Sequence, residues 1–213
     1  MKSVAVIDYG MGNLHSVAKA LERVAEGTTR VVVSHDPALI LRADRVVLPG
    51  VGAIRDCMHE IKRLGMDEVV REVVKTKPLL GVCVGMQALL EFSAENGGTE
   101  CLGVLPGRAA FFGNVLRDFA EHLKVPHMGW NQVHQTGDHP MWRGIGQDSR
   151  FYFVHSYFLP GTSAITAGST EYGVVFTSAV TQDNVFATQF HPEKSAAAGL
   201  RLYANFLEWD GAA

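Results

Sequence analysis

The sequence has few cysteines, and they do not form a recognisable framework. Its 213 residues include three of them, Cys57, Cys83 and Cys101, an odd number without paired spacing. Cysteine usage of this kind argues against a disulfide scaffold and against a structural zinc site. We therefore expect a reducing compartment and no bound metal.

Long apolar segments and basic clusters are also missing. No stretch approaches the length of a membrane-spanning helix, and the short apolar run at the N-terminus meets Asp8 too soon for a signal peptide. Lysines and arginines are scattered, and the formal net charge is -3, so nucleic acid is not an expected partner. The expectation is a cytoplasmic protein that binds neither membranes nor nucleic acid.

What the chain does contain is typical of one folded domain. Hydrophobic residues make up 47% and charged residues 19%, which is enough to bury a full core. No repeat, linker or low-complexity segment divides the sequence, so we expect a single domain over 1–213.

In the first half, apolar runs predict buried strands that alternate with helices of regular apolar spacing. The strands are expected at 3–7, 29–34, 45–48 and 79–83, and the helices near 14–24, 37–40, 54–64 and 66–74.

After Gly97 and Gly98 the pattern changes to shorter runs separated by turns. Strands are expected at 109–115, 125–133, 150–158, 165–175 and 185–190, followed by a helix over 195–209. The resulting fold class is α/β, a three-layer sandwich. Its central mixed, mainly parallel sheet is flanked by helices, and an antiparallel extension of the same sheet comes from the second half.

The first strand is followed by Gly10-Met11-Gly12, which invites comparison with a dinucleotide-binding loop. The third glycine of that fingerprint is absent, because His15 stands in its place. We interpret the two glycines as a tight turn and expect Asn13 to cap the following helix. No cofactor is therefore expected.

Cys83 stands where the fourth strand breaks into a helix, with Gly81 two residues before it and Gly85 two residues after. This spacing is typical of a nucleophile elbow, in which small residues allow a sharp, tightly packed turn. Cys83 is thus a candidate nucleophile. The alternative is a buried cysteine that packs as a small hydrophobe.

The third strand ends in Pro49-Gly50-Val51-Gly52. Two glycines around a small residue allow backbone amides to turn outward, as an oxyanion hole requires, although a plain connection is also possible. Because carboxyl ends of parallel strands share one sheet edge, we expect this loop and Cys83 to lie together.

A cysteine nucleophile usually needs a histidine, and nine are present. Six lie in helices, turns or polar loops without an evident partner: His15, His35, His59, His122, His134 and His139. His191 differs because it ends a strand and precedes Pro192 and Glu193. Proline favours an extended residue before it, so Glu193 can bond one imidazole nitrogen while the other faces the sulfur. An exposed turn is the alternative.

Together these residues resemble the class I, triad-type glutamine amidotransferases. The stretch 81–87 is similar to their nucleophile motif, and 189–193 to their His-x-Glu motif. Within that family, five stretches resemble members that supply ammonia to a separate (β/α)₈ barrel cyclase in histidine biosynthesis. They are 8–14, 49–53, 127–131, 153–157 and 191–195.

The resemblance implies a glutaminase with a Cys-His-Glu triad. Cys83 would attack the side-chain amide of glutamine, His191 would transfer protons and Glu193 would orient the imidazole. A cysteinyl thioester would form, ammonia would leave, and water would release glutamate. The amide of Val84 and one amide from Gly50, Val51 or Gly52 would hold the oxyanion.

The same resemblance implies substrate and partner residues. The polar groups of glutamine would be held by Gln87, Glu95, His155, Ser156 and Tyr157. Trp130 and Lys194 resemble interface residues of a heterodimer with the barrel cyclase. The alternative for Trp130 is a packed aromatic residue, and for Lys194 a solvated lysine is an equally ordinary explanation.

Two other functions stay open from the sequence. A different cysteine hydrolase could use the same elbow, and it would act without a partner and without glutamine. A non-catalytic regulator could bind glutamine, although it would have no need of Cys83, His191 and Glu193 together.

Overall fold

The computed structural model describes residues 1–119 and 123–212, and within this part twelve strands form one mixed sheet. Half of the sheet is parallel, in the order β2-β1-β3-β4-β14. Its members are β1 (Lys2–Ile7), β2 (Thr29–Ser34), β3 (Arg45–Gly50), β4 (Leu79–Cys83) and β14 (Val185–Thr188). The expected strands of the first half are therefore present.

The register of this parallel half positions the chemistry. Gly50 pairs with Cys83 between β3 and β4, and Val82 pairs with Thr188 between β4 and β14. Since all three strands run in the same direction, the segments that follow them emerge at one edge of the sheet. The expected meeting of 49–52 with Cys83 is thus confirmed, and the chain after β14 reaches the same place.

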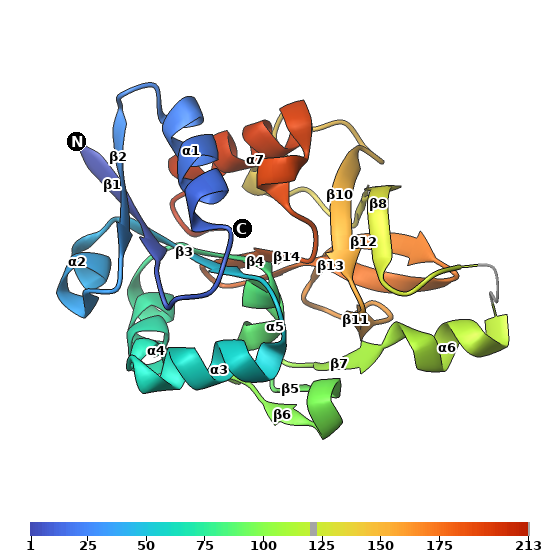
Figure 1. The fold of residues 1–213 in the computed structure, drawn as a ribbon. Coiled ribbons are helices and arrows are strands. Elements are labelled where there is room, and N and C mark those ends of the chain that lie inside the picture. The colour runs from blue at the N-terminus through green and yellow to red at the C-terminus, as the bar shows by residue number, and fades with distance from the viewer. Residues whose placement is uncertain (120–122, 213) are drawn as a thin grey trace.

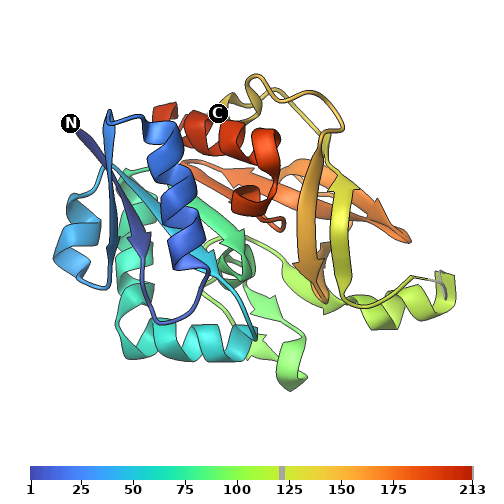
Figure 2. The ribbon, with the colours of Figure 1, turned by 45° about the horizontal axis from the view of Figure 1, so that its top comes forward.

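Helices cover both faces of the parallel half (Figure 1). One face carries α1 (Leu14–Ala25) and α7 (Ala196–Glu208), which lie side by side in both views (Figure 2). The other face carries α3 (Ile54–Arg63), α4 (Met66–Thr76) and α5 (Val84–Leu89), and α2 (Pro37–Arg42) packs against α4. Each of the longer helices buries one apolar stripe, as α1 does with Val17, Leu21 and Ala25.

In the described part of the chain, seven further strands extend the sheet beyond β14; all their pairings are antiparallel except that of β5 with β7, and we call them the antiparallel half. They are β5 (Phe92–Ser93), β6 (Thr99–Glu100), β7 (Arg108–Phe111), β9 (His134–Gln135), β11 (Tyr157–Pro160), β12 (Thr166–Tyr172) and β13 (Val174–Gln182). Short 3₁₀ turns are η1 (Glu95–Gly97), η2 (Pro140–Trp142) and η3 (Pro192–Lys194). The mixed sheet between helices confirms the expected fold class.

Expectations for four stretches of this half are wrong in part. The stretch 150–158 divides into β10 (Arg150–His155) and β11, and the stretch 165–175 includes the turn between β12 and β13, a strand that was not expected. The stretch expected as one strand over 109–115 divides into β7 and a helix, α6 (Phe112–Phe119), whose Phe112 and Leu116 are buried. The strands β8 (His127–Gln132) and β10 (Arg150–His155) do not extend the main sheet but pair with each other in a separate two-stranded sheet. Strand propensity fixes neither where a strand ends nor which strand it joins.

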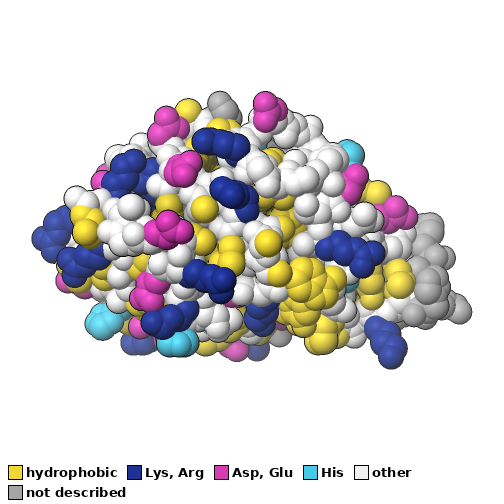
Figure 3. Space-filling model, turned by 90° about the horizontal axis from the view of Figure 1, so that it is seen from above, with side chains coloured by type: hydrophobic (Ala, Val, Ile, Leu, Met, Phe, Trp, Pro, Cys, Tyr) yellow, Lys and Arg dark blue, Asp and Glu magenta, His cyan; other side chains and the backbone are white. Residues whose placement is uncertain are grey.

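Side chains in the cores of the two halves differ. Aliphatic residues fill the parallel half, whereas stacked and edge-to-face aromatic rings such as Phe112, Phe158 and Phe176 fill the antiparallel half. On the face seen in Figure 3, lysines and arginines are dispersed among acidic residues, and hydrophobic side chains gather near β8 and β10. Among the helices that the structure describes, none is both long and apolar enough to span a membrane.

Candidate active site

The turn between β4 and α5 holds Cys83 in a strained conformation. Its φ and ψ angles are 55° and -112°, and a side-chain-bearing residue adopts a positive φ only when its surroundings enforce it. Gly81 and Gly85 permit the close packing, because a Cβ on Gly85 would lie 2.0 Å from the carbonyl oxygen of Leu48 and one on Gly81 would lie 2.9 Å from Ala187. The expected elbow is present, with the unusual backbone angle on the cysteine itself.

His191 and Glu193 follow β14 and lie at the same sheet edge. The Nδ1 of His191 lies 2.8 Å from Oε1 of Glu193, and the two side chains are only 3% and 1% exposed. Two hydrogen bonds fix the His191 backbone. The His191 amide donates to the Tyr152 carbonyl, and the His191 carbonyl accepts from the Ser195 hydroxyl at 2.6 Å. The sequence expectation that Glu193 reaches one imidazole nitrogen is met.

The charges around His191 set its protonation. Burial alone lowers the pKa of this imidazole, but the interactions with Cys83 and then with Glu193 outweigh burial and raise the pKa to about 10. For Glu193, burial acts in the opposite direction and raises the pKa. The hydrogen bond from His191 and the charge of His191 outweigh burial, so the pKa of Glu193 falls below the usual value. The arrangement therefore favours a charged imidazole between Cys83 and the Glu193 carboxylate.

A cavity of about 390 Å³ opens over Cys83 and His191. Its wall includes most of the residues expected at the site: Val51, Gly52, Cys83, Val84, Gln87, Glu95, His155, Ser156, Tyr157, His191 and Lys194. The volume is sufficient for a small polar substrate. Gly50 and Glu193 lie behind this wall, and Trp130 lies outside it.

The loop 49–52 is held from beneath by two side chains. The hydroxyl of Tyr9 donates to the Pro49 carbonyl at 2.6 Å, and the thiol of Cys57 donates to the Val51 carbonyl at 3.3 Å. A Cβ on Gly50 would lie 2.6 Å from the Gly85 amide nitrogen, so a larger residue there would collide with the elbow. Gly52 has a φ of +85°, which favours glycine.

Two of the expected substrate residues also make bonds within the protein. The Gln87 amide donates to the Tyr157 carbonyl at 3.0 Å and to Oε1 of Gln189 at 2.8 Å. Glu95 accepts a bond from the amide of Ile54 at 3.0 Å and so satisfies the first turn of α3, which has no cap of its own. Both residues still line the cavity.

His155 forms part of a directed chain of hydrogen bonds. Because the Tyr157 carbonyl can only accept, Nδ1 of His155 must donate to it, at 2.8 Å. Nε2 of His155 then accepts from Nδ1 of His127 at 2.9 Å, and Nε2 of His127 accepts from the Asn131 amide at 3.2 Å. Burial lowers the pKa of His155 to about 3 and that of His127 to about 4. Both imidazoles are neutral.

The other two cysteines are in different surroundings. Burial raises the pKa of both Cys57 and Cys101 to about 11, so their thiols stay protonated at neutral pH. Only Cys83 of the three is in the cavity wall that the described residues form. In the same residues no cluster of three potential metal ligands occurs.

Sequence reasoning assigned no role to Gln189 and assigned a wrong one to Asn13. The amide of Gln189 lies 3.8 Å from the Cys83 sulfur, and this contact follows from a strand register that the sequence does not reveal. Asn13 precedes α1 but makes no side-chain capping bond, and instead its amide lies 3.5 Å from Oε1 of Glu193. The distance along the chain, 180 residues, explains why local patterns could not predict it.

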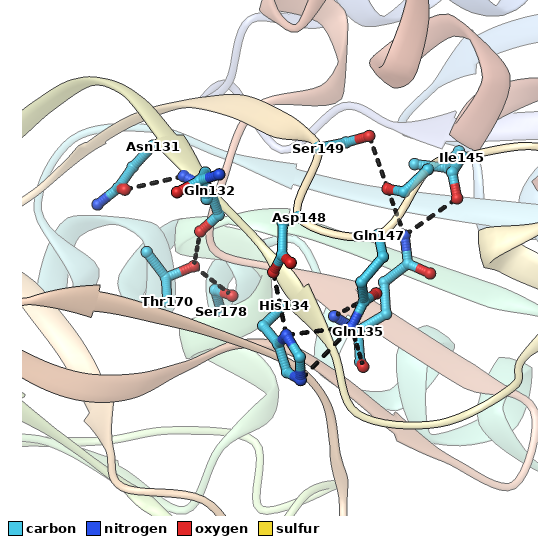
Figure 4. Close-up of polar contacts among 11 residues, drawn as sticks. Asn131, Gln132, His134, Gln135, Ile145, Gln147, Asp148, Ser149, Thr170 and Ser178 are labelled. Atoms are coloured by element: carbon cyan, nitrogen blue, oxygen red, sulfur yellow. Dashed lines mark hydrogen bonds and ion pairs between the residues drawn. The ribbon is translucent and has the colours of Figure 1, made fainter.

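Other histidines bond elsewhere. His134 does have a carboxylate partner, since its Nδ1 lies 3.0 Å from Asp148, and Figure 4 shows both inside an exposed network with Gln135 and Gln147. His139 accepts a bond from the Met141 amide and lies 3.1 Å from the Thr181 hydroxyl. His122 lies outside the described residues. These contacts join loops to strands, away from the cavity.

The two expected interface residues both lie beside Tyr152, and one of them lines the cavity. Lys194 lines the cavity, and its ammonium lies 5.7 Å from the ring centroid of Tyr152. The second residue, Trp130 on β8, is 49% exposed, and its ring contacts that of Tyr152 in an edge-to-face arrangement. Met128, on the same strand, is 61% exposed. An exposed aromatic group next to an active-site cavity is typical of a protein interface.

Comparison with known proteins defines the class. The family model for class-I glutamine amidotransferases matches residues 5–209. Solved structures share the fold: one glutamine amidotransferase has a TM-score of 0.71 at 20% identity, covering 96% of this chain and 97% of that one. A glutamine amidotransferase of Thermotoga maritima has a TM-score of 0.58 at 16% identity, covering 97% and 83%. The chain belongs to the class-I glutamine amidotransferases.

Curated relatives narrow the family further. The imidazole glycerol phosphate synthase subunit HisH 1 of Pseudomonas aeruginosa is 60% identical over 212 residues, 99% of each chain. The HisH subunits of Pseudomonas putida and Nitrosococcus oceani are 59% and 58% identical over the same share. Within the class, the chain is a member of the HisH family.

Proposed function

We propose that this chain is the glutaminase subunit of an imidazole glycerol phosphate synthase, which hydrolyses glutamine and passes ammonia to a (β/α)₈ barrel cyclase. The observation that carries the proposal is the buried His191–Glu193 pair, 2.8 Å apart, beside Cys83 in a cavity of suitable size. The names of its full-length relatives indicate the enzyme of which this chain is proposed to be a subunit.

The reaction begins with attack of the Cys83 sulfur on the side-chain amide carbon of glutamine. His191 then gives a proton to the amide nitrogen, the carbon–nitrogen bond breaks, and ammonia leaves a cysteinyl thioester. Water next attacks the thioester while His191 takes its proton, the carbon–sulfur bond breaks, and glutamate leaves with Cys83 and His191 back in their starting states. Glu193 holds the imidazole in place throughout both steps.

The oxyanion that forms in both steps needs two donors close to Cys83. One is the amide of Val84, which begins α5 directly after the nucleophile. The other comes from the loop Gly50, Val51 and Gly52, which β-sheet register places beside Cys83. Donors aimed at the developing charge can contribute about 3 kcal/mol to catalysis.

Glutamine is held by the opposite wall. Glu95 and the backbone of Ser156 and Tyr157 are the polar groups proposed to bind its ammonium and carboxylate ends, and they line the cavity. Gln87 and His155 support this wall, because both bond the Tyr157 carbonyl. His155 has both ring nitrogens occupied, so it shapes the pocket through this carbonyl.

The partner is proposed to cover the cavity rim at Trp130 and Lys194, forming a heterodimer. In this assignment ammonia is used on the barrel cyclase, and closure of the rim by that protein would keep ammonia from bulk water. Trp130 and Met128 supply exposed apolar surface for the contact.

Regulation is proposed to lie in the loop 49–52. Tyr9 holds the Pro49 carbonyl and Cys57 holds the Val51 carbonyl. The peptide between Gly50 and Val51 is flanked by these two fixed points, and glycine lets its amide rotate at little steric cost. We expect the isolated chain to be nearly inactive and the partner with its nucleotide ligand to activate it. Full activity of the isolated chain would contradict this mechanism.

The test mixes the chain with the barrel cyclase and its nucleotide ligand and follows glutamate release. Wild type is expected to hydrolyse glutamine. In Cys83→Ala the rate of glutamate release should fall by a factor of at least about 10³. The matched control is Cys101→Ser, which removes a thiol of raised pKa away from the cavity and should stay within about twofold of wild type. If glutamine is untouched by wild type, or if Cys83→Ala is equally active, the proposal is wrong.

A further inference from the structure

The carboxylate of Glu193 is held at both oxygens, and only one of its contacts is the histidine. Oε1 meets Nδ1 of His191 at 2.8 Å and, more distantly, the Asn13 amide at 3.5 Å. Oε2 accepts a bond from the hydroxyl of Tyr203 at 3.3 Å. Tyr203 is on α7 and is fully buried. Asn13 directly precedes α1, which lies beside α7 on one face of the sheet (Figures 1 and 2). Residues from these two segments therefore reach the same carboxylate.

A buried carboxylate needs such donors. The Glu193 side chain is 1% exposed, so water cannot replace a missing partner, and an unpaired buried oxygen carries a large desolvation cost. With Oε2 unbonded, the carboxylate can rotate about its last bond or take up a proton. Either change weakens its hold on His191 Nδ1, which fixes the direction in which the other nitrogen points.

We propose that Tyr203 is a positioning residue for the triad, acting through Glu193 to keep the carboxylate ionised and aligned with His191. The inference rests on the proposed triad and adds a fourth residue to it, from the last helix. Asn13 assists on Oε1 through its longer contact.

The groups around Glu193 support a donor role for the Tyr203 hydroxyl. Burial, followed by the charge and hydrogen bond of Glu193, raises the pKa of Tyr203 well above its ordinary value, so it is a neutral donor at working pH. His191, the Glu193 backbone and Asn13 all favour the carboxylate against its burial. Cys83 faces His191 on the far side. Loss of the tyrosine hydroxyl removes the hydrogen bond to Oε2 in a buried site, so we expect it to shift Glu193 towards its protonated form.

Tyr203 does not belong to the cavity wall that the described residues form. Its removal should therefore change the rate of the chemical steps and leave glutamine binding nearly unaltered. A packing residue without this role would lower thermal stability but would not move a titration of activity.

The first experiment measures the pH dependence of glutamate release by Tyr203→Phe in the complex with the barrel cyclase and its nucleotide ligand. We expect kcat to fall about tenfold, KM for glutamine to stay within about twofold, and the acid limb of kcat to move to higher pH. The control is Tyr172→Phe, which removes a hydroxyl bonded to the Lys124 carbonyl at 2.7 Å and should keep the wild-type profile. An acid limb and kcat equal to wild type overturn the proposal.

The second experiment removes the carboxylate. Because Tyr203 acts through Glu193, the effect of Tyr203→Phe on kcat should shrink to within about twofold in a Glu193→Gln background. An equal tenfold effect in both backgrounds overturns the proposal and points to a general packing role, which thermal melts of the same variants measure. If wild type releases no glutamate, the proposed function fails; if wild type is active and Tyr203→Phe matches it, only the positioning role fails.

Discussion

Two buried histidines lie in the cavity wall, one after a strand of the parallel half and one at the end of the separate β8–β10 sheet. His191 follows the parallel strand β14, and His155 ends β10 beside the antiparallel strands. Burial lowers the pKa of both, yet that of His191 rises to about 10 while that of His155 falls to about 3. The difference comes from their neighbours: a thiol and a carboxylate for His191, a carbonyl and a neutral imidazole for His155. Charge partners, more than burial, separate a proton-transfer group from a structural one.

The comparison extends to the surroundings. The parallel half supplies the proposed nucleophile, the loop 49–52 and the His191–Glu193 pair from three adjacent strand ends. The antiparallel half and the separate β8–β10 sheet supply other parts of the cavity wall, and β8 carries the exposed Trp130. Reactive groups therefore concentrate where parallel strands end, and the added strands shape the pocket and its rim.

The largest effect is expected from removing the charge partner of His191. Glu193→Gln retains size but not charge, so the imidazole loses its anionic partner and its fixed orientation. The rate of glutamate release in the complex should fall about 10²-fold or more. Glu171→Gln, on β12, is the matched control and should be near wild type. Equal rates for the two variants would contradict the special role of the parallel half.

A smaller effect, on stability, is expected at the elbow. A Cβ on Gly85 would lie 2.0 Å from the Leu48 carbonyl oxygen, whereas one on Gly137 meets nothing within 4 Å. Gly85→Ala should therefore lower the free energy of unfolding by about 3 kcal/mol, and Gly137→Ala should change it by less than about 0.5 kcal/mol. Denaturant unfolding measures both. Similar values would mean that the elbow can relax.

The two histidine environments also predict opposite pH effects on stability. The raised pKa of His191 gives stability that is complete below pH 6.5 and is lost as pH rises towards 10. The lowered pKa values of His155 and His127 give stability that is complete above pH 6.5 and is lost as pH falls towards 3–4. His127→Gln should reduce the loss of unfolding free energy at acid pH by about 1–2 kcal/mol. It should leave the loss of stability at alkaline pH unchanged. Melting curves from acid to alkaline pH test this, and an unchanged acid limb would contradict it.

The smallest effect on the chain itself is expected at the rim. Trp130→Ala removes an exposed ring, so the free energy of unfolding should change by less than about 0.5 kcal/mol. Affinity for the barrel cyclase should nevertheless fall about tenfold, since exposed aromatic residues often dominate interfaces. Calorimetric titration measures the affinity. The control is Lys19→Ala, on the exposed side of α1, which should bind like wild type. Unchanged affinity would remove Trp130 from the proposed interface.

The sequence was sufficient for features that depend on local order. The elbow glycines, the loop 49–52 and the His-Pro-Glu segment are short patterns, and the alternation of strands and helices predicts that they meet at one edge. It was insufficient where contacts cross the chain. The hydrogen bonds from Asn13 and Tyr203 to Glu193 depend on how α1 and α7 pack on the sheet. That β8 and β10 pair with each other and not with the main sheet depends on strand pairing between distant parts of the chain.

The division of α6 from β7 was missed for a related reason. Short apolar runs suit a strand and a buried helix equally well, and only the environment of Phe112 among aromatic rings decides between them. Gln189 was missed because its role depends on the pairing of β14 with β4.

The central claim is that Cys83 forms the covalent intermediate. The direct measurement is to mix the complex with isotope-labelled glutamine, quench it in acid during turnover, and locate the label by peptide mass spectrometry. The account predicts label on the peptide that contains Cys83, none on those with Cys57 or Cys101, and more label in Glu193→Gln if thioester hydrolysis is slowed. Label on another residue, or glutamate release without any labelled peptide, would contradict it.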